Sequence, residues 1–466
     1  MLRASRERRS LGLACWTLAL GIFAGCATGR TIDAASLDLL SVPAQVPWVY
    51  WIGAGLVGCG FLLFRDHAGQ WTSLAMGILV AVFMVGPTWM EAAVRSPDSY
   101  AQAIGVSLLS AGRQTEFWYY PFIGFHALAL VLDDVVGLAI PGGMRLMSLS
   151  MFTLVPIVAF PLVASNTSGH RLPLALTGLI GMMGLANSVS YNPQALGLLL
   201  FATCVFLLTK RVPGARPAFV ASFLALVMTH GLSAAVVGLV AVVYLSWNQV
   251  FRNNRAGFVS LTTVLFTFVT FTALIFYSSA TLGLRVVDAF LNNVLKSPLA
   301  FTSAFFHTTA YSPARTPDVL LTYADIALVL AWFGFGLLSA RRSPTRSKVI
   351  LQALLVLSVP VFVLGTGSFT SEGLVRGFLY DAVFIAVAAA LTGPTGRRAM
   401  VTVAGVVTLG FALMYGRDGI ELPDRPILAS AQFMIEAASS DSARTLQPDC
   451  YFAPNLVSDP NVAAGV

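Results

Sequence analysis

The sequence predicts an all-α polytopic membrane protein with about 13 transmembrane helices, and three observations lead to this fold class. Hydrophobic residues make up 57% of the chain and charged residues only 11%, whereas soluble domains carry about 25% charged residues. The apolar residues form runs long enough to cross a bilayer. The basic residues lie in short clusters between these runs, so the net charge of +7 does not indicate a nucleic-acid partner.

The predicted spans follow one another along the chain with short polar connections. The first comes after the basic N-terminus MLRASRERRS and is expected to be an uncleaved first helix. Its end, Phe23-Ala24-Gly25-Cys26, approximates a lipoprotein cleavage box, which leaves lipidation of Cys26 open. The runs lie at about 11–28, 47–64, 72–90, 146–163, 172–187, 194–209, 216–229, 231–247, 257–278, 319–340, 349–365, 377–392 and 399–415.

A further apolar run at 121–140 is interpreted from loop charge, because it contains Asp133-Asp134 and begins with a proline. If this run enters and leaves on the outer side, the inner segments hold 17 of the 28 Lys and Arg residues but only two of the 21 acids. Such an excess of positive charge is typical of cytoplasmic segments. We therefore expect a re-entrant or interfacial segment at 121–140, with a cavity beside it, because partly inserted chain needs protein or water around it.

This arrangement predicts a multi-pass plasma-membrane protein with a cytoplasmic N-terminus and an external C-terminus. The exported segments are 30–46, 91–120, 187–193, 279–318, 368–376 and the C-terminal tail. The chain then divides into N-terminal transmembrane helices at 1–90, an exported loop and re-entrant segment at 91–145, a transmembrane core at 146–415 and an exported tail at 416–466.

Asp98 is an isolated acid in the polar exported stretch, within the sequence SPDSY. An acid in this position is suited to act as a general base that takes a proton from an acceptor hydroxyl. It is also consistent with a solvated loop acid, or with the N-cap of a helix that starts at Ser99-Tyr100-Ala101. In the first interpretation, 91–145 is an exported catalytic loop.

Aromatic and histidine side chains end the same stretch, in the run Tyr119-Tyr120-Pro121 to His126. Tyrosines at a membrane boundary are typical of an interfacial belt, and a histidine in an apolar segment is often a neutral, hydrogen-bonded one. The alternative is that Tyr119, Tyr120 and His126 line a substrate site. For Asp133-Asp134, structural and functional interpretations are equally supported.

Two further polar turns are predicted on the outer face. Asn187 to Gln194 reads NSVSYNPQ, and Asn187, Tyr191 and Asn192 in it are suited either to capping two helices or to hydrogen bonding with a sugar. His230 lies at the next outer turn, where a structural role is the commoner one.

Late in the chain, Ser-Glu-Gly-Leu-Val-Arg leads into the predicted span at 377–392. Its Arg376 could clamp a phosphate through two parallel hydrogen bonds, or pair with Glu372 one helical turn away. The sequence contains no phosphate-binding loop, dinucleotide fingerprint or zinc-ligand spacing. We therefore expect no metal and no cofactor.

In order and in predicted sidedness, these pieces resemble the GT-C superfamily of integral-membrane glycosyltransferases. The resemblance covers roughly residues 90–395 and rests on SPDSY, YYPFIGFH, NSVSYNPQ, the Thr-His turn and the late Glu-x-x-x-Arg. It implies a polyprenyl-phosphate sugar donor, a glycan or protein acceptor, and an active site at the outer membrane face with metal-independent inversion. Asp98 corresponds to the family's loop acid, 119–126 to the donor-site lining and Arg376 to a phosphate-binding arginine.

The sequence departs from the family pattern in two ways. Two additional helices precede the acid, and the acid is single, without an Asp-x-Asp or Asp-Glu pair. Other membrane classes therefore remain open. They are a lipid-linked polysaccharide polymerase or ligase, for which the 279–318 segment has three basic residues, a transporter or flippase, and a non-catalytic scaffold.

Overall fold

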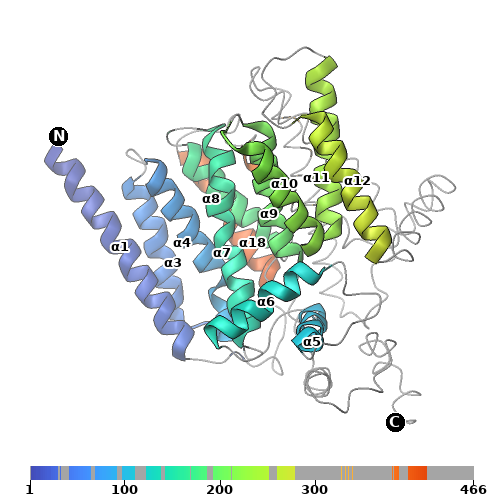
Figure 1. The fold of residues 1–466 in the computed structure, drawn as a ribbon. Helices are drawn as coiled ribbons and strands as arrows, with labels where there is room; N and C mark the ends of the chain where they lie inside the picture. The colour runs from blue at the N-terminus through green and yellow to red at the C-terminus, as the bar shows by residue number, and fades with distance from the viewer. Residues whose placement is uncertain are drawn as a thin grey trace, which may run out of the picture.

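The computed structural model shows a helical protein in which apolar helices stand side by side as a bundle (Figure 1). The structure describes residues 2–29, 32, 41–64, 69–91, 97–110, 122–137, 142–167, 169, 171–185, 193–210, 212–250, 260–278, 380, 382–387 and 397–416, with the single positions 327, 331, 334 and 338.

The described helices match most of the apolar runs in the sequence. They are α1 (Leu2–Gly29), α2 (Ser41–Gln45), α3 (Trp48–Phe64), α4 (Gln70–Met90), α5 (Pro97–Ser110), α6 (Ile123–Val136), α7 (Gly142–Ala164), α8 (Arg171–Leu185), α9 (Pro193–Thr209), α10 (Ala215–Thr229), α11 (Gly231–Val250), α12 (Leu261–Ser278) and α18 (Arg397–Gly416).

By length and composition, three helical segments within the described ranges are suited to crossing a membrane: Glu7–Gly29, Gln70–Met90 and Gly143–Ala164. Shorter apolar helices accompany them, including α3, α9 and α10. These helices fit a membrane protein. The total of about 13 spans remains a prediction, because the runs at 319–340 and 349–365 lie almost entirely outside the described residues.

Successive long helices run in alternating directions, so the bundle has two distinct ends (Figure 1). We call one the basic end; α1, α4, α8 and α10 begin there. Described cations at or next to this end are Arg8, Arg9, Arg171, Lys210, Arg216 and Arg398. The other we call the α5 end, because α5 and α6 lie there. The described parts of the segments predicted to be cytoplasmic thus lie at one end of the bundle, as a single membrane orientation requires.

Glycines allow the first two long helices to pack closely. Aromatic rings of α1 lie against glycines of α3: a Cβ added to Gly60 would overlap the Trp16 ring, and one added to Gly53 would lie 2.7 Å from the Phe23 ring. The pairing is antiparallel, since the α3 partner moves back by seven residues as α1 advances by seven. Van der Waals contact at small residues replaces the hydrophobic effect as the source of helix association in lipid.

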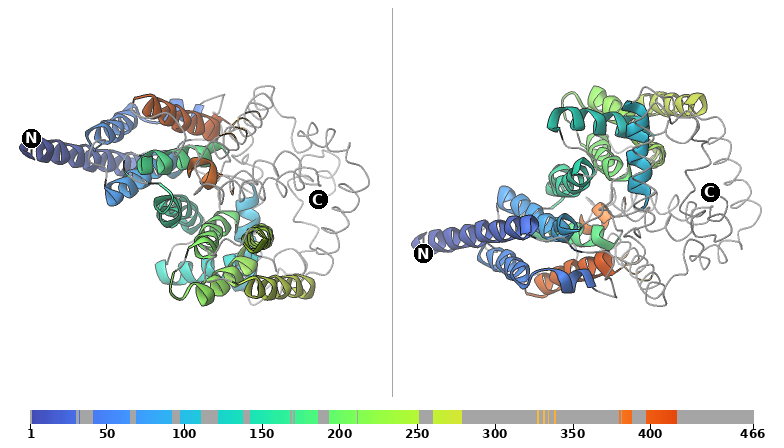
Figure 2. Two further views of the ribbon diagram at one scale, coloured as in Figure 1. Left: turned by 90° about the horizontal axis from the view of Figure 1, so that it is seen from above. Right: turned by 90° about the horizontal axis from the view of Figure 1, so that it is seen from below.

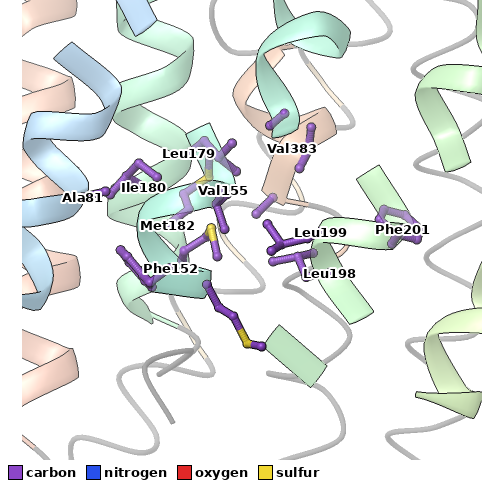
Figure 3. Packing of buried hydrophobic residues seen from close by; sticks show 14 of the residues in the cluster. Ala81, Phe152, Val155, Leu179, Ile180, Met182, Leu198, Leu199, Phe201 and Val383 are labelled. Carbon is purple, nitrogen blue, oxygen red and sulfur yellow. The ribbon is translucent and has the colours of Figure 1, made fainter. Parts of the chain in front are cut away.

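The centre of the bundle is mainly apolar. Residues 382–387 are helical, and all six are buried, as expected of a helix that is hydrophobic all round. Figure 3 shows Val383 of this segment beside residues of α7, α8 and α9, among them Val155, Leu179 and Leu199. The view of the bundle from above shows the same grouping around α8 (Figure 2).

Within the exported loop predicted across 91–120, residues 97–110 form α5, so the helix considered as an alternative at Ser99 is present and begins two residues earlier. Proline at the first helical position and an acid in the first turn are standard helix-start features, and one face of α5, including Ala103, Ile104 and Val106, is buried. The run at 121–140 contains α6, which has 14 residues and a rise of about 21 Å. The expectation that this segment does not cross stays a prediction, because α8 and α10, which lie in predicted crossings, have only 15 residues each.

Candidate functional site: a polar junction at the α5 end

Polar side chains from α5 and α6 meet at the α5 end of the bundle. His126 Nε2 lies 2.7 Å from Gln102 Oε1, and the His126 side chain is buried. Burial lowers the pKa of His126 to about 4, so the ring is neutral at pH 7 and Nε2 donates to the amide oxygen. The contact joins α6 to α5, the helix that carries Asp98.

The start of α6 packs on the turn between α10 and α11. A Cβ added to Gly124 would lie 3.1 Å from the main-chain carbonyl of Met228, so the absence of a side chain permits this approach. Beside it, the rings of Phe122 and His230 are stacked, with centroids 6.0 Å apart and an interplanar angle of 17°. The second predicted histidine therefore lies at the same junction as the first.

His230 separates α10 from α11 and caps the start of α11. Its extended backbone ends α10, and its Nδ1 accepts the main-chain N–H of Ser233 at 3.2 Å. This is the hydrogen bond that an N-cap side chain makes with the third residue of a helix. The Ser233 hydroxyl lies 2.6 Å from the same Nδ1.

Ser233 extends the junction to the centre of the bundle. Its hydroxyl is hydrogen-bonded to the hydroxyl of Tyr380, and both residues are buried. The Tyr380 ring also packs edge-on against Phe201 of α9, with centroids 4.9 Å apart. On α9, a Cβ added to Gly197 would lie 2.7 Å from Ser233 Oγ, so a glycine is needed for this approach.

A series of contacts, interrupted by one step along the chain of α6, thus links α5 to Tyr380. It runs from Gln102 to His126, one turn back along the chain to Phe122, then to His230, Ser233 and Tyr380. Its members come from positions 102 to 380 and therefore from parts of the sequence that are far apart.

Asp98 and Arg376 flank the two ends of this series in the sequence. Asp98 is in the first turn of α5, four residues before Gln102, which is about 6 Å along the helix axis. Because α5 begins at Pro97, Asp98 belongs to the first turn and is not the N-cap. The structure describes its backbone position. Arg376 precedes Tyr380 by four residues and lies outside the described residues.

The structure brings together only part of the predicted site. His126 and His230 are placed in one junction, with Asp98 on an adjoining helix. The remaining predicted residues lie outside the described part of the chain: Tyr119, Tyr120, Asn187, Tyr191, Asn192, Glu372 and Arg376.

Asp133 and Asp134 lie in the last turn of α6, away from the contacts of His126. Asp133 is half-buried and Asp134 is exposed. Gly137 ends the helix in the left-handed conformation, with its N–H bonded to the carbonyl of Asp133. The two acids thus belong to a capped helix end, which is about 10 Å along the helix from His126.

Sequence reasoning missed Gln102, Ser233 and Tyr380. A lone glutamine in a polar stretch gives no signal. Ser233 does carry one, because it is the third residue after His230, the spacing at which an N-cap residue bonds a helix N–H. Tyr380 meets Ser233 because segments far apart in the chain pack together. The spacing of residues along the sequence does not predict such a contact.

Metal ligation has no support among the residues that the structure describes, where no group of three or more His, Cys, Asp or Glu side chains could hold an ion. No known family model matches the chain, and comparison with curated proteins finds no significant match.

Proposed function

We propose that this protein is a membrane glycosyltransferase that moves a sugar from a polyprenyl-phosphate donor to an acceptor hydroxyl at the outer face of the membrane. One observation carries the proposal. The contacts at the α5 end connect the helix of Asp98 with Tyr380, which is four residues after Arg376 in the chain.

The chemistry requires a base and a counter-charge. Asp98 takes the proton of the acceptor hydroxyl as the new oxygen–carbon bond forms at the anomeric carbon. The bond from that carbon to the phosphate oxygen breaks with inversion, and the electron pair leaves with the polyprenyl phosphate. Arg376 stabilises the departing phosphate. A phosphate is already a good leaving group, so no general acid is needed.

The apolar bundle supports the choice of donor. A polyprenyl chain is soluble only in lipid, so an enzyme that uses such a donor must present its site at the bilayer surface. The junction is polar, and it lies at the end of helices whose outward side chains, such as Met228 on α10 and Phe266 on the neighbouring α12, are apolar and exposed. Side chains of this kind suit contact with acyl chains.

The decisive experiment measures donor binding and sugar transfer separately. Purified Asp98→Asn protein, given a panel of polyprenyl-phosphate sugars, should bind donor as the unmodified protein does but transfer sugar at least about 100-fold more slowly, the contribution typical of a general base. Asp134→Asn, which alters an exposed acid in α6, is the matched control and should keep full activity.

Full transfer by Asp98→Asn would remove Asp98 from the mechanism. Movement of the labelled lipid across the bilayer by the unmodified protein, with the sugar–phosphate bond intact, would instead identify a transporter.

A further inference from the structure

The C-terminal half of α6 projects from the bundle. In the first half of the helix, Phe125 and Ala129 are buried, and the helix as a whole contacts α5, α7 and α10. From 131 to 137, every residue except Asp133 is exposed. Figure 1 shows α6 lying obliquely to the upright long helices. The second half of α6 therefore presents a surface that the other described helices leave uncovered.

The exposed surface of α6 is apolar on one side and acidic on the other. The apolar residues follow one another at spacings of three and four, which places them on one side of a helix. We call them the α6 stripe: Leu128, Val131, Leu132, Val135 and Val136. Val135, near the middle of the stripe, is 77% exposed. At 100° per residue, Asp133 and Asp134 lie on the opposite side.

The α6 stripe lies at the level of a membrane interface. Trp48, the first residue of α3, and Trp89, near the end of α4, are exposed at the same end of the bundle, and tryptophan is enriched at membrane interfaces. The apolar segment Gly143–Ala164 is long enough to cross a membrane. The chain from Gly137 to the start of that segment reaches at most about 20 Å, so α6 ends close to the place where α7 enters the bilayer.

The stripe also continues the outward surface of α10. Gly124, one turn before Leu128, packs on the backbone of Met228 at the end of α10. The Met228 side chain is itself apolar and exposed. An outward apolar surface on a helix of this bundle suits contact with acyl chains, and the α6 stripe extends that surface sideways.

We propose that the C-terminal half of α6 docks on the acyl chains of the leaflet at the α5 end, with the α6 stripe toward lipid and Asp133 and Asp134 toward the headgroups and water. A helix with one apolar and one charged side lies in the plane of the interface in this way. The docking would hold the helix that carries His126. It does not depend on the reaction proposed above.

The two acids determine which lipid suits this surface. α6 contains no Lys or Arg, and its carboxylates are in the last turn, where the helix dipole is also negative. Anionic headgroups attract basic segments and therefore repel this one. The docking surface fits zwitterionic lipid such as phosphatidylcholine, in contrast to interfacial helices with a basic polar side.

Fluorescence quenching in phosphatidylcholine vesicles tests the docking. The full chain is labelled at single cysteines that replace Val131, Asp134 or Val135 in an otherwise cysteine-free protein. A nitroxide on the lipid chains should quench the labels of Val131→Cys and Val135→Cys about twofold or more strongly than that of Asp134→Cys. Iodide in the water should give the reverse order. Met228→Cys is the control for a lipid-facing position and should behave as Val135→Cys does.

Two results would overturn the inference. Equal quenching of all three α6 positions by iodide would place the stripe in water. Protection of Val131→Cys and Val135→Cys from both quenchers would show that protein covers the stripe, either a second copy or another segment of this chain.

The role of the acids is tested by lipid charge. At low ionic strength, the lipid nitroxide should quench Val135→Cys about twofold less in phosphatidylglycerol vesicles than in phosphatidylcholine vesicles, and added salt should reduce the difference. With Asp133→Asn and Asp134→Asn in the same chain, the two vesicles should quench equally. Equal quenching with both acids present would overturn the lipid preference assigned to them.

Discussion

At the residue scale, Pro87 explains an unusual pair of tyrosine contacts. A proline inside a helix has no N–H, so the carbonyl four residues earlier, on Phe83, loses its helical partner. The hydroxyl of Tyr50 on α3 donates to that carbonyl, and the hydroxyl of Tyr415 on α18 donates to the next one, on Met84, at 2.8 Å. In lipid, no water is present to satisfy a carbonyl freed by a kink.

This compensation predicts a coupling between Pro87 and Tyr50. Tyr50→Phe should lower the free energy of unfolding by about 1 kcal/mol, the usual loss of a hydrogen bond between helices in a membrane. In the Pro87→Ala background the same change should cost less than half as much, because the introduced alanine has an N–H that can bond to the Phe83 carbonyl. Reversible unfolding of the four proteins in mixed micelles measures the coupling, and equal costs in both backgrounds would contradict it.

At the element scale, α18 is joined to α8 through glycines. A Cβ added to Gly410 would overlap the carbonyl oxygen of Gly181, and one added to Gly184 would lie 2.9 Å from that of Gly410. The helices are parallel, since Gly181 lies against Val407 and Gly184, three residues further on, lies against Gly410. Contact between backbones leaves no flexible side chain to move aside.

Gly410→Ala should therefore force the two helices apart and lower stability by about 2 kcal/mol or more, in the range of overpacking in cores. Gly405→Ala is the control on the same helix, where an added Cβ meets nothing within 4 Å. This control should be neutral or gain about 0.5–1 kcal/mol from its better helix propensity. Thermal unfolding of the two purified variants measures the difference. Similar melting temperatures for Gly410→Ala and Gly405→Ala would show that α18 does not pack on α8 as described.

The elements also show what hydrophobic pattern can predict. The runs at 172–187, 194–209 and 231–247 are close in extent to α8, α9 and α11. A helix in lipid can be recognised in a sequence from the length and apolarity of its run alone. For α5 the sequence indicates a helix from Ser99 only as one alternative, because its buried face is short and includes Ser99 and Ser107. The pairing of α8 with α18 depends on three-dimensional contact between glycines that are more than 200 residues apart.

The site was predictable only where a residue carries its own signal. A histidine within an apolar helix or turn is costly enough to require a purpose, and on this basis His126 and His230 were singled out. Their partners Gln102, Ser233 and Tyr380 are ordinary uncharged residues whose significance comes from what they contact. The sequence thus indicates the strongly polar members of a buried network, and the structure supplies the rest.

At the scale of the whole molecule, two exposed tryptophans on α4 indicate where a bilayer would lie. Trp71 is 78% exposed near the basic end and Trp89 is 41% exposed near the α5 end. Their separation of 18 residues corresponds to about 27 Å along a helix, close to the hydrocarbon thickness of about 30 Å. Tryptophan is enriched at both membrane interfaces, so the positions match a helix that crosses once.

The most consequential test of the whole molecule is which end of the bundle faces the cytoplasm. If the basic end is cytoplasmic, as the positive-inside rule predicts, the polar junction faces the exterior. Single cysteines in an otherwise cysteine-free chain report this directly. Asp134→Cys is exposed near the α5 end, and Gly69→Cys is exposed at the start of α4, at the basic end. Neither change removes a buried contact.

A membrane-impermeant maleimide added to intact cells should label Asp134→Cys and leave Gly69→Cys unlabelled until the membrane is permeabilised. The reverse pattern would place the junction of His126 and His230 in the cytoplasm. An acceptor outside the cell could then not reach Asp98, and the proposed transfer at the outer face would be impossible. Labelling of both cysteines from outside would show that α4 does not cross, which would contradict the membrane placement derived from its tryptophans.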